Sequence, residues 1–211
     1  MRYCSLGHGC HSAAILQRLG IKIESYPFDW MNSRPGMIKD CIEDDFKKFL
    51  DRSYYSEIVN HWDDHDACQH DFYASYLQDV SNPEKQIIFR HRNPLVDDEA
   101  YAYYQRCVER FRKLLSSNEE KTFIIMYPNR SLDTTASMMD TLSLSNFLVK
   151  YTNNFKIIAV HGSVTGYRSH KITGGKNLKF IQLTTVTNDD GGNYTGQEDN
   201  QYLSEIIKKL L

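Results

Sequence analysis

Short apolar runs and longer stretches with helical spacing alternate along this chain of 211 residues. Continuous apolar runs are typical of strands buried on both faces of a sheet, whereas apolar residues three and four positions apart are typical of amphipathic helices. We expect strands at Tyr3–Leu6, Ile21–Tyr26, Ile87–His91, Thr122–Tyr127, Phe155–Val160 and Leu178–Val186. We expect helices at Ala13–Gly20, Gly36–Asp51, Asp97–Ser116, Ser143–Tyr151 and Asp199–Leu211.

This alternation predicts an α/β fold, because right-handed crossovers between strands build a mostly parallel sheet flanked by helices. A chain of this length most simply forms one domain, here residues 1–211. Ligands of such sheets bind beyond the carboxyl ends of the strands. In this chain those ends are followed by Gly7–His11, Tyr127–Arg130, His161–Ser163 and Thr185–Asp190.

The first of these strand ends carries Cys10, at or just before the start of a helix. The positive end of a helix favours anions and lowers the pKa of a nearby thiol, so Cys10 is a candidate nucleophile. A buried, unreactive cysteine is one alternative. The other is a loop that holds an anionic ligand without reacting, in which Gly7, His8, Gly9 and His11 would contact the ligand.

Composition narrows the range of partners. The formal net charge of -2 gives no electrostatic reason to expect nucleic acid or an anionic membrane. No apolar run is long enough to span a bilayer, and the N-terminus shows no basic and apolar leader. The five cysteines are scattered and odd in number, which suits reduced thiols better than a disulfide framework. We therefore expect a protein of a reducing, intracellular compartment, the cytoplasm.

A polar segment at residues 61–72 contains four potential metal ligands: His61, His65, Cys68 and His70. Their spacing matches no common zinc pattern, so we predict no metal and no other cofactor, and interpret the segment as a solvated loop. In a second interpretation, His70 and Asp71 supply a base and an orienting carboxylate to Cys10. Asp29, which lies between two aromatic residues, either caps a local turn or orients a catalytic group.

Five motifs follow one another along roughly the first 115 residues: Ser5-Leu6-Gly7 with Cys10, Tyr26–Trp30, Asp44-Asp45-Phe46, His70-Asp71-Phe72, and Arg106 with Arg110-Phe111. This order resembles the uncharacterised family of papain-like cysteine peptidases. The resemblance implies that Cys10 is the nucleophile, His70 its base, and Asp71 or Asp29 the orienting acid. It also implies a papain-like α+β fold. Because strands and helices alternate in the second half of the chain, we favour the α/β fold over this alternative.

We therefore predict a cysteine-dependent hydrolase or peptidase that acts on a small-molecule, glycan or peptide substrate. The alternative is a glycosyl- or other group transferase that binds a phosphate-bearing donor at the glycine-rich loop. Four further residues are candidates for substrate binding: Trp30 by stacking, Arg110 and Arg130 through phosphate or carboxylate groups, and His161 at a strand end. The sequence makes no prediction of the oligomeric state.

Overall fold

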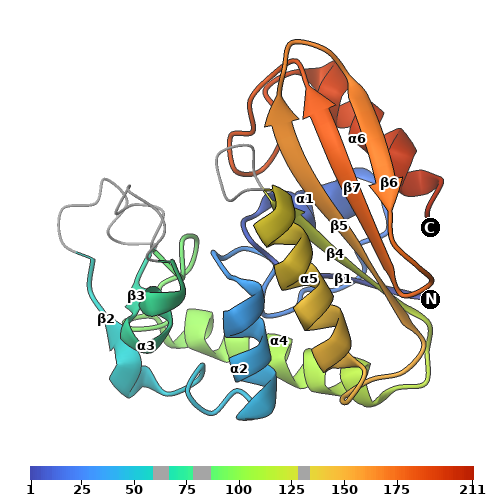
Figure 1. The fold of residues 1–211 in the computed structure, drawn as a ribbon. Helices are drawn as coiled ribbons and strands as arrows, with labels where there is room; N and C mark the ends of the chain where they lie inside the picture. Colours follow the sequence, from blue (N-terminus) through green and yellow to red (C-terminus); the bar gives the residue numbers. More distant parts are fainter. Residues whose placement is uncertain (59–66, 78–86, 128–133) are drawn as a thin grey trace.

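The computed structural model describes residues 1–58, 67–77, 87–127 and 134–211, which are built around a five-stranded sheet (Figure 1). Its strands, in the order β1-β4-β5-β7-β6, are β1 (Arg2–Ser5), β4 (Lys121–Tyr127), β5 (Phe155–Val164), β7 (Leu178–Thr185) and β6 (Ser169–Thr173). Each neighbouring pair from β1 to β7 is parallel, and β6 is antiparallel to β7. The predicted α/β class with a mostly parallel sheet is therefore confirmed.

Helices cover both faces of this sheet (Figure 1). The helices α1 (His11–Arg18) and α6 (Gln197–Lys208) pack on one face, and α2 (Pro35–Glu43), α4 (Asp98–Ser116) and α5 (Thr134–Leu148) pack on the other. Alternate residues of β4 enter the two cores, since successive side chains of a strand point to opposite faces. Phe123 and Ile125 belong to the core under α2, α4 and α5, whereas Ile124 and Met126 belong to the core under α1 and α6.

Between α2 and α4 the chain forms a small side region. It contains η1 (Arg52–Tyr54), β2 (Tyr55–Ser56), β3 (Gln69–His70), α3 (Asp71–Ala74) and η2 (Ser75–Leu77), and β2 is antiparallel to β3. Phe89, which is fully buried, joins this region to the rest of the fold. Its backbone pairs with Met31 and with Cys68, and its ring contacts the rings of Phe49 and Tyr104.

Two predicted strands are wrong. The segment predicted as a strand at Ile21–Tyr26 is a loop, because Asp29 binds it locally: its carboxylate accepts hydrogen bonds from the backbone of Tyr26 and from Lys22. In the segment predicted as a strand at Ile87–His91, only Phe89 forms backbone bridges.

Two helix predictions had the wrong bounds. The helix predicted to reach Asp51 ends at Glu43, and Asp45 and Phe46 then take φ values of 54° and 58° that no α-helix accommodates. The helix predicted to begin at Ser143 begins at Thr134 instead. Its buried face includes Ser137 and Thr141, so the apolar pattern of its first turns is weak. The exposed strand β6 had no apolar pattern and was not predicted.

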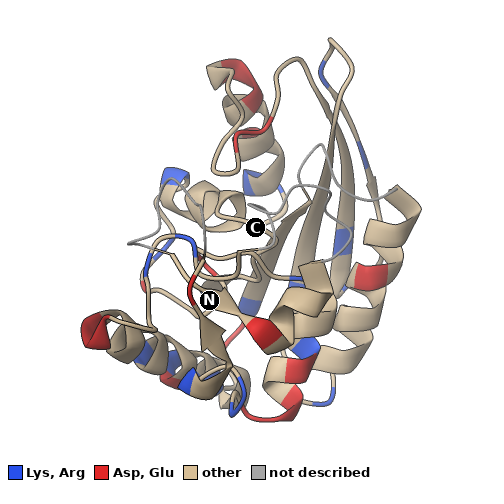
Figure 2. Ribbon diagram, turned by 90° about the vertical axis from the view of Figure 1, so that its left-hand side faces the viewer, with Lys and Arg blue, Asp and Glu red and all other residues tan. Residues whose placement is uncertain are grey.

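In the view of Figure 2, acidic and basic positions both occur along the helices. Among the described residues, no helix combines the length and the apolar character needed to cross a bilayer.

Candidate functional site

The chain leaves β1 through a tight turn that ends at Cys10. Gly7, His8 and Gly9 all have positive φ values, of 77°, 72° and 142°, so the chain reverses within three residues and enters α1 directly after Cys10. A Cβ atom at Gly7 would lie 2.0 Å from the Ser33 hydroxyl oxygen, which excludes any larger residue there. Cys10 therefore lies at the carboxyl edge of the sheet, where ligands of parallel sheets bind.

Ser12, in the first turn of α1, fixes this loop to the sheet. Its hydroxyl donates to the Gly7 carbonyl over 2.6 Å and accepts from the backbone N–H of Met126 in β4 over 2.9 Å. Ser12 is fully buried, and so both bonds are protected from water.

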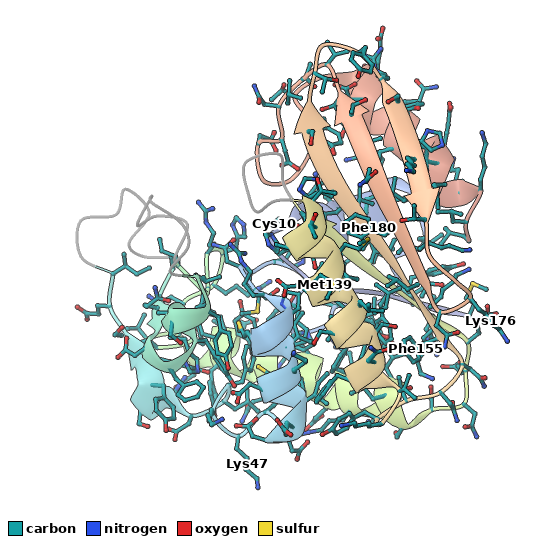
Figure 3. The ribbon with its side chains drawn as sticks, in the orientation of Figure 1. Cys10, Lys47, Met139, Phe155, Lys176 and Phe180 are labelled. Carbon is teal, nitrogen blue, oxygen red and sulfur yellow. The ribbon has the colours of Figure 1, made fainter. Side chains whose placement is uncertain are left out.

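The imidazole of His91 faces the thiol of Cys10: Nε2 lies 3.1 Å from Sγ. His91 is exposed and Cys10 is partly exposed, so this pair lies at the molecular surface where a substrate can approach. The other four cysteines, Cys4, Cys41, Cys68 and Cys107, are buried. His91 follows Phe89 by two residues, and the bridges of Phe89 to Met31 and Cys68 hold this segment beside the loop. Figure 3 labels Cys10 at the upper end of α2 and α5, away from Phe155 at the start of β5.

Burial raises the pKa of Cys10 to about 11. The positive charge of Arg90 acts in the opposite direction, whereas the negative charges of Asp189 and Asp29 raise the pKa further. The resting residue is therefore a neutral thiol, and its S–H donates to Nε2 of His91 when the imidazole proton is on Nδ1. A neutral pair of this kind reacts by general-base catalysis, in which the proton moves to the imidazole as the sulfur attacks.

The structure does not bring His70 to Cys10. The Nε2 atom of His70 bonds the Lys48 carbonyl over 3.0 Å, and its Nδ1 atom is buried with no hydrogen-bond partner among the described residues. Its ring is fully buried and packs against the rings of Tyr54 and Tyr73. Asp71, at the start of α3, accepts a hydrogen bond from the Ser56 hydroxyl. The base predicted for Cys10 thus belongs to the side region, and the imidazole at hydrogen-bond distance is that of His91.

Asp29 caps a turn, the first of the two roles considered for it. One carboxylate oxygen accepts from the Tyr26 N–H over 3.0 Å and from Lys22 Nζ over 2.5 Å. The carboxylate is 1% exposed, and burial raises its pKa while Lys22 and the Tyr26 N–H oppose that shift. Asp29 makes no hydrogen bond to His70 or His91 among the contacts of the described residues.

His8 lies in the loop after β1, and His161 lies within β5, which continues to Val164 instead of ending at Val160 as predicted. The ring of His8 is 4.8 Å from the ring of Tyr127, and His161 is the register partner of Tyr127 on the next strand. Nδ1 of His161 lies 3.4 Å from the hydroxyl of Thr134 at the start of α5. Burial lowers the pKa of His8 well below its ordinary value, and the charges of Arg34 and His161 act in the same direction.

His11 pairs with Asp189, from the loop that follows β7. Nδ1 of His11 and the Asp189 carboxylate are 2.6 Å apart, and both side chains are about 3% exposed. The backbone N–H of His11 also donates a hydrogen bond to the Gly191 carbonyl over 3.0 Å. This loop therefore covers the start of α1 beside Cys10.

The remaining predicted binding residues are dispersed. Trp30 is half-buried in the turn that precedes Met31. Arg110, on α4, donates to the Ser25 carbonyl over 3.3 Å and lies 3.8 Å from the Glu24 carboxylate. Arg130 lies outside the described residues.

Potential metal ligands do not cluster in the described part of the chain: no group of three or more His, Cys, Asp or Glu side chains is arranged to hold an ion there. Two of the four ligands considered in the sequence, His61 and His65, lie outside the described residues.

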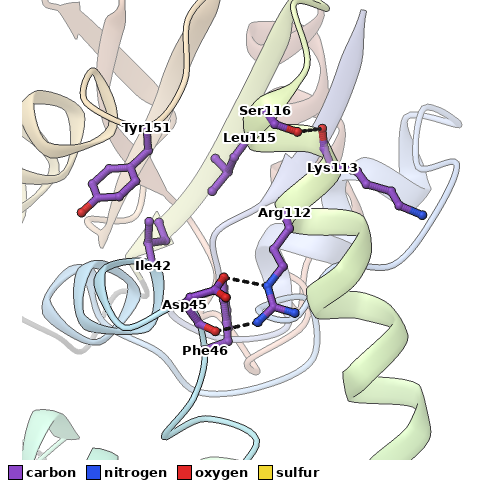
Figure 4. A pocket seen from close by; sticks show the side chains of 8 residues that line it. All are labelled: Ile42, Asp45, Phe46, Arg112, Lys113, Leu115, Ser116 and Tyr151. Atoms are coloured by element: carbon purple, nitrogen blue, oxygen red, sulfur yellow. Dashed lines mark hydrogen bonds and ion pairs between the residues drawn. The ribbon is translucent and has the colours of Figure 1, made fainter.

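A shallow pocket of about 420 Å³ lies at the opposite end of the sheet from Cys10 (Figure 4). It is lined by residues from the ends of α2 and α4, and Arg112 and Asp45 form an ion pair of 2.7 Å within it. No residue of the Cys10 site contributes to this pocket.

Sequence reasoning missed two members of the site, His91 and Asp189. His91 ended a run that was interpreted as a strand, and a histidine two residues after the apolar residues Ile87–Phe89 was the available signal. Asp189 lies beyond the last parallel strand, at an edge where ligands were expected, but its pairing with His11 spans 178 residues. Contacts of such separation leave no local pattern in a single sequence.

Comparison with known proteins identifies a family and a relative of this chain. Residues 1–161 match the family described as "Putative papain-like cysteine peptidase (DUF1796)". The "Uncharacterized protein R408" of Acanthamoeba polyphaga mimivirus is 30% identical over 227 aligned positions, which cover 97% of this chain and 96% of that protein. No solved structure matches the chain significantly. The family match includes Cys10, His91 and His161.

Proposed function

Because this chain belongs to the family described as putative papain-like cysteine peptidases, we propose that it is a cysteine hydrolase whose nucleophile is Cys10 and whose general base is His91. The observation that carries this proposal is the 3.1 Å separation of Sγ from Nε2 at the carboxyl edge of the sheet. That separation lies within the reach that proton transfer between a nucleophile and its base requires.

The reaction proceeds in two half-reactions. Sγ of Cys10 attacks the substrate carbonyl carbon while its proton passes to Nε2 of His91, which requires the resting imidazole proton on Nδ1. The tetrahedral oxyanion collapses, the bond to the leaving group breaks, and His91 returns the proton to that group. Water then attacks the thioester with His91 as base, which releases a carboxylic acid and restores the thiol.

The fold supports this chemistry at the oxyanion. Cys10 directly precedes α1, so an oxyanion formed by attack of its sulfur would lie near the positive end of that helix and the backbone amide of Cys10. The pair also occurs in the order Cys before His along the chain, as the papain-like family name implies.

The group-transferase alternative has less support. A donor phosphate at the start of α1 would need the first amides of the helix, and the Gly191 carbonyl already accepts the N–H of His11. Transfer of the acyl group to an acceptor other than water uses the same covalent intermediate and remains part of the proposed chemistry.

Turnover of a substrate panel tests the proposal. Peptide amides, alkyl esters and alkyl thioesters are incubated with the wild-type protein, with Cys10→Ala, and with His170→Asn. His170 is exposed on β6 and bonds Tyr202 of α6, which makes it a control for histidine replacement away from Cys10. We expect turnover of at least one class by the wild-type protein and by His170→Asn, and none by Cys10→Ala. Turnover retained by Cys10→Ala would exclude Cys10 as the nucleophile.

A further inference from the structure

His8 is a buried imidazole without a hydrogen-bond partner. The residue is 4% exposed, and neither Nδ1 nor Nε2 has a partner among the described residues. The other five described histidines each form at least one side-chain hydrogen bond. A buried polar atom left unsatisfied costs about 1–3 kcal/mol, so an imidazole with two such atoms requires an explanation.

The backbone holds His8 in this position. Its φ of 72° lies in the left-handed region, which few residues other than glycine adopt, although histidine is among the types found there. Its N–H donates to the Ser33 hydroxyl over 3.1 Å, and that hydroxyl donates to the Leu6 carbonyl over 3.2 Å. An unfavourable backbone conformation maintained by its surroundings is typical of functional sites.

The charged surroundings of His8 favour an anion over a cation. Arg34, which precedes the first residue of α2, and His161 of β5 both act on the imidazole with positive charge. Asp140 raises the pKa of the neighbouring Tyr127, but no carboxylate of the described residues is among the groups that shift the pKa of His8. A metal cation bound to the His8 nitrogens would be repelled by the guanidinium of Arg34. An oxyanion would instead accept a hydrogen bond from the imidazole N–H and be attracted by the positive charge of Arg34.

We propose that the substrate of the Cys10 site carries an oxyanion group, a carboxylate or a phosphate, that binds to His8 together with Arg34 and His161. This inference rests on the proposed function, because it names the substrate class of the same site. His8 precedes Cys10 by two residues, so their Cα atoms are within about 7 Å of each other. The anionic group would therefore lie close to the attacked carbonyl. Both nitrogens of His8 are shielded from solvent, and the ring or its neighbours must move when the anion enters.

Thermal unfolding with inorganic phosphate and with sodium acetate tests this proposal, with sodium chloride at equal ionic strength as the reference. A ligand that binds only the folded state raises the melting temperature in proportion to the logarithm of its concentration above Kd. We expect one or both anions to raise the melting temperature of the wild-type protein above that in chloride. A response to phosphate alone assigns a phosphate group, and a response to acetate alone assigns a carboxylate.

The His8→Asn variant identifies the residue. Asparagine tolerates positive φ, so this variant removes the imidazole without changing the backbone requirement. We expect His8→Asn to lose the anion response and His170→Asn to keep it. An equal response in wild-type protein and His8→Asn, or no response beyond chloride in the wild-type protein, would overturn the proposal. If His8→Asn fails to fold, the imidazole resonances of His8 in the wild-type protein give the answer, because bound anion must shift them.

The Cys10→Ala variant separates this inference from the proposed function. It should retain the full anion response, since the sulfur takes no part in binding. Anion binding without acyl transfer would contradict the proposed hydrolase function but would support the oxyanion site. Acyl transfer at Cys10 without an anion response would contradict the oxyanion site alone.

Discussion

The chemistry of Cys10 depends on a balance between burial and charge at single residues. Burial raises the pKa of the thiol to about 11, although the residue precedes a helix whose positive end favours the thiolate. Desolvation outweighs the opposing effects of Arg90 and of a backbone hydrogen bond to Cys10. The consequence is a neutral thiol that needs the imidazole of His91 as a base at the moment of attack.

Alkylation by iodoacetamide should reveal this raised pKa. A thiol with a pKa of about 11 has far less thiolate at pH 7 than a free thiol with a pKa of about 8.5, and its greater nucleophilicity offsets only part of that difference. We expect Cys10 to react about 20-fold more slowly than a free cysteine at pH 7, and the rate to keep rising above pH 9. Site-resolved mass spectrometry measures the rate, and a midpoint below pH 8 would contradict a neutral resting pair.

Two charge-removing substitutions should shift the same rate in opposite directions. Arg90 lowers the pKa of Cys10, so Arg90→Gln should raise that pKa further and slow alkylation at pH 8. Asp189 raises the pKa, so Asp189→Asn should lower it and speed alkylation. The two variants serve as controls for each other. If both substitutions change the alkylation rate in the same direction, the charges of Arg90 and Asp189 do not determine the pKa of Cys10.

At the scale of elements, Ser12 connects three of them: the loop after β1, the helix α1 and the strand β4. Replacement of Ser12 by alanine leaves the Gly7 carbonyl and the Met126 N–H buried without this partner. We expect Ser12→Ala to lower the free energy of unfolding by about 2–4 kcal/mol, measured by urea denaturation. Ser204→Ala is the matched control, because the Ser204 hydroxyl bonds only the Asn200 carbonyl within α6. A loss for Ser12→Ala no larger than that of the control would contradict this role.

The start of α6 is stabilised by Asp199, which is fully buried. Burial raises its pKa, but hydrogen bonds from the Thr187 hydroxyl and N–H, the Val186 N–H and Arg168 outweigh burial, and the net pKa is lowered. A lowered pKa contributes stability in full above the unfolded value of about 3.9, and this stability is lost as the pH falls through the folded value.

Asp199→Asn should therefore destabilise the protein at pH 7 by about 2–4 kcal/mol, and its difference from wild type should shrink below pH 4. Glu198→Gln is the neighbouring control, because its ion pair with Arg168 is exposed and contributes about 0–1 kcal/mol. Urea denaturation at pH 7 and pH 3 gives both values. A difference that stays constant between the two pH values would contradict the contribution of the ionised carboxylate.

Elements were predictable where an apolar pattern was strong. The strands β4 and β7 and the helix α4 were predicted close to their observed bounds, because both faces of a parallel strand and one face of a long helix are apolar. The start of β5 was predicted correctly, but the strand continues to Val164 instead of ending at Val160. The start of α5 was not predicted correctly, because Ser137 and Thr141 occupy buried positions where apolar residues are usual. There the buried hydroxyl of Thr141 bonds Tyr127 and the Ser137 carbonyl. Hydrogen bonding across the fold thus replaces the pattern on which the prediction depended.

At the scale of the whole molecule, parallel topology brings distant segments to one edge. The position of Cys10 at that edge was predictable from the strand that precedes it. The partner of Cys10 was not, because His91 reaches it through the bridges of Phe89 with Met31 and Cys68, and these depend on the complete fold. The sequence motif instead favoured His70, which the structure places against Lys48.

The most direct test of the central claim is the rate at which p-nitrophenyl acetate acylates Cys10, followed by peptide mass spectrometry at pH 7. It compares the wild-type protein with His91→Asn, His70→Gln and His170→Asn, each at a temperature where the variant is folded. We predict an acetyl thioester at Cys10, formed about 10²-fold or more slowly by His91→Asn and at near wild-type rate by the other two variants. Equal rates in wild-type protein and His91→Asn, or a selective loss in His70→Gln, would contradict the Cys10–His91 pair.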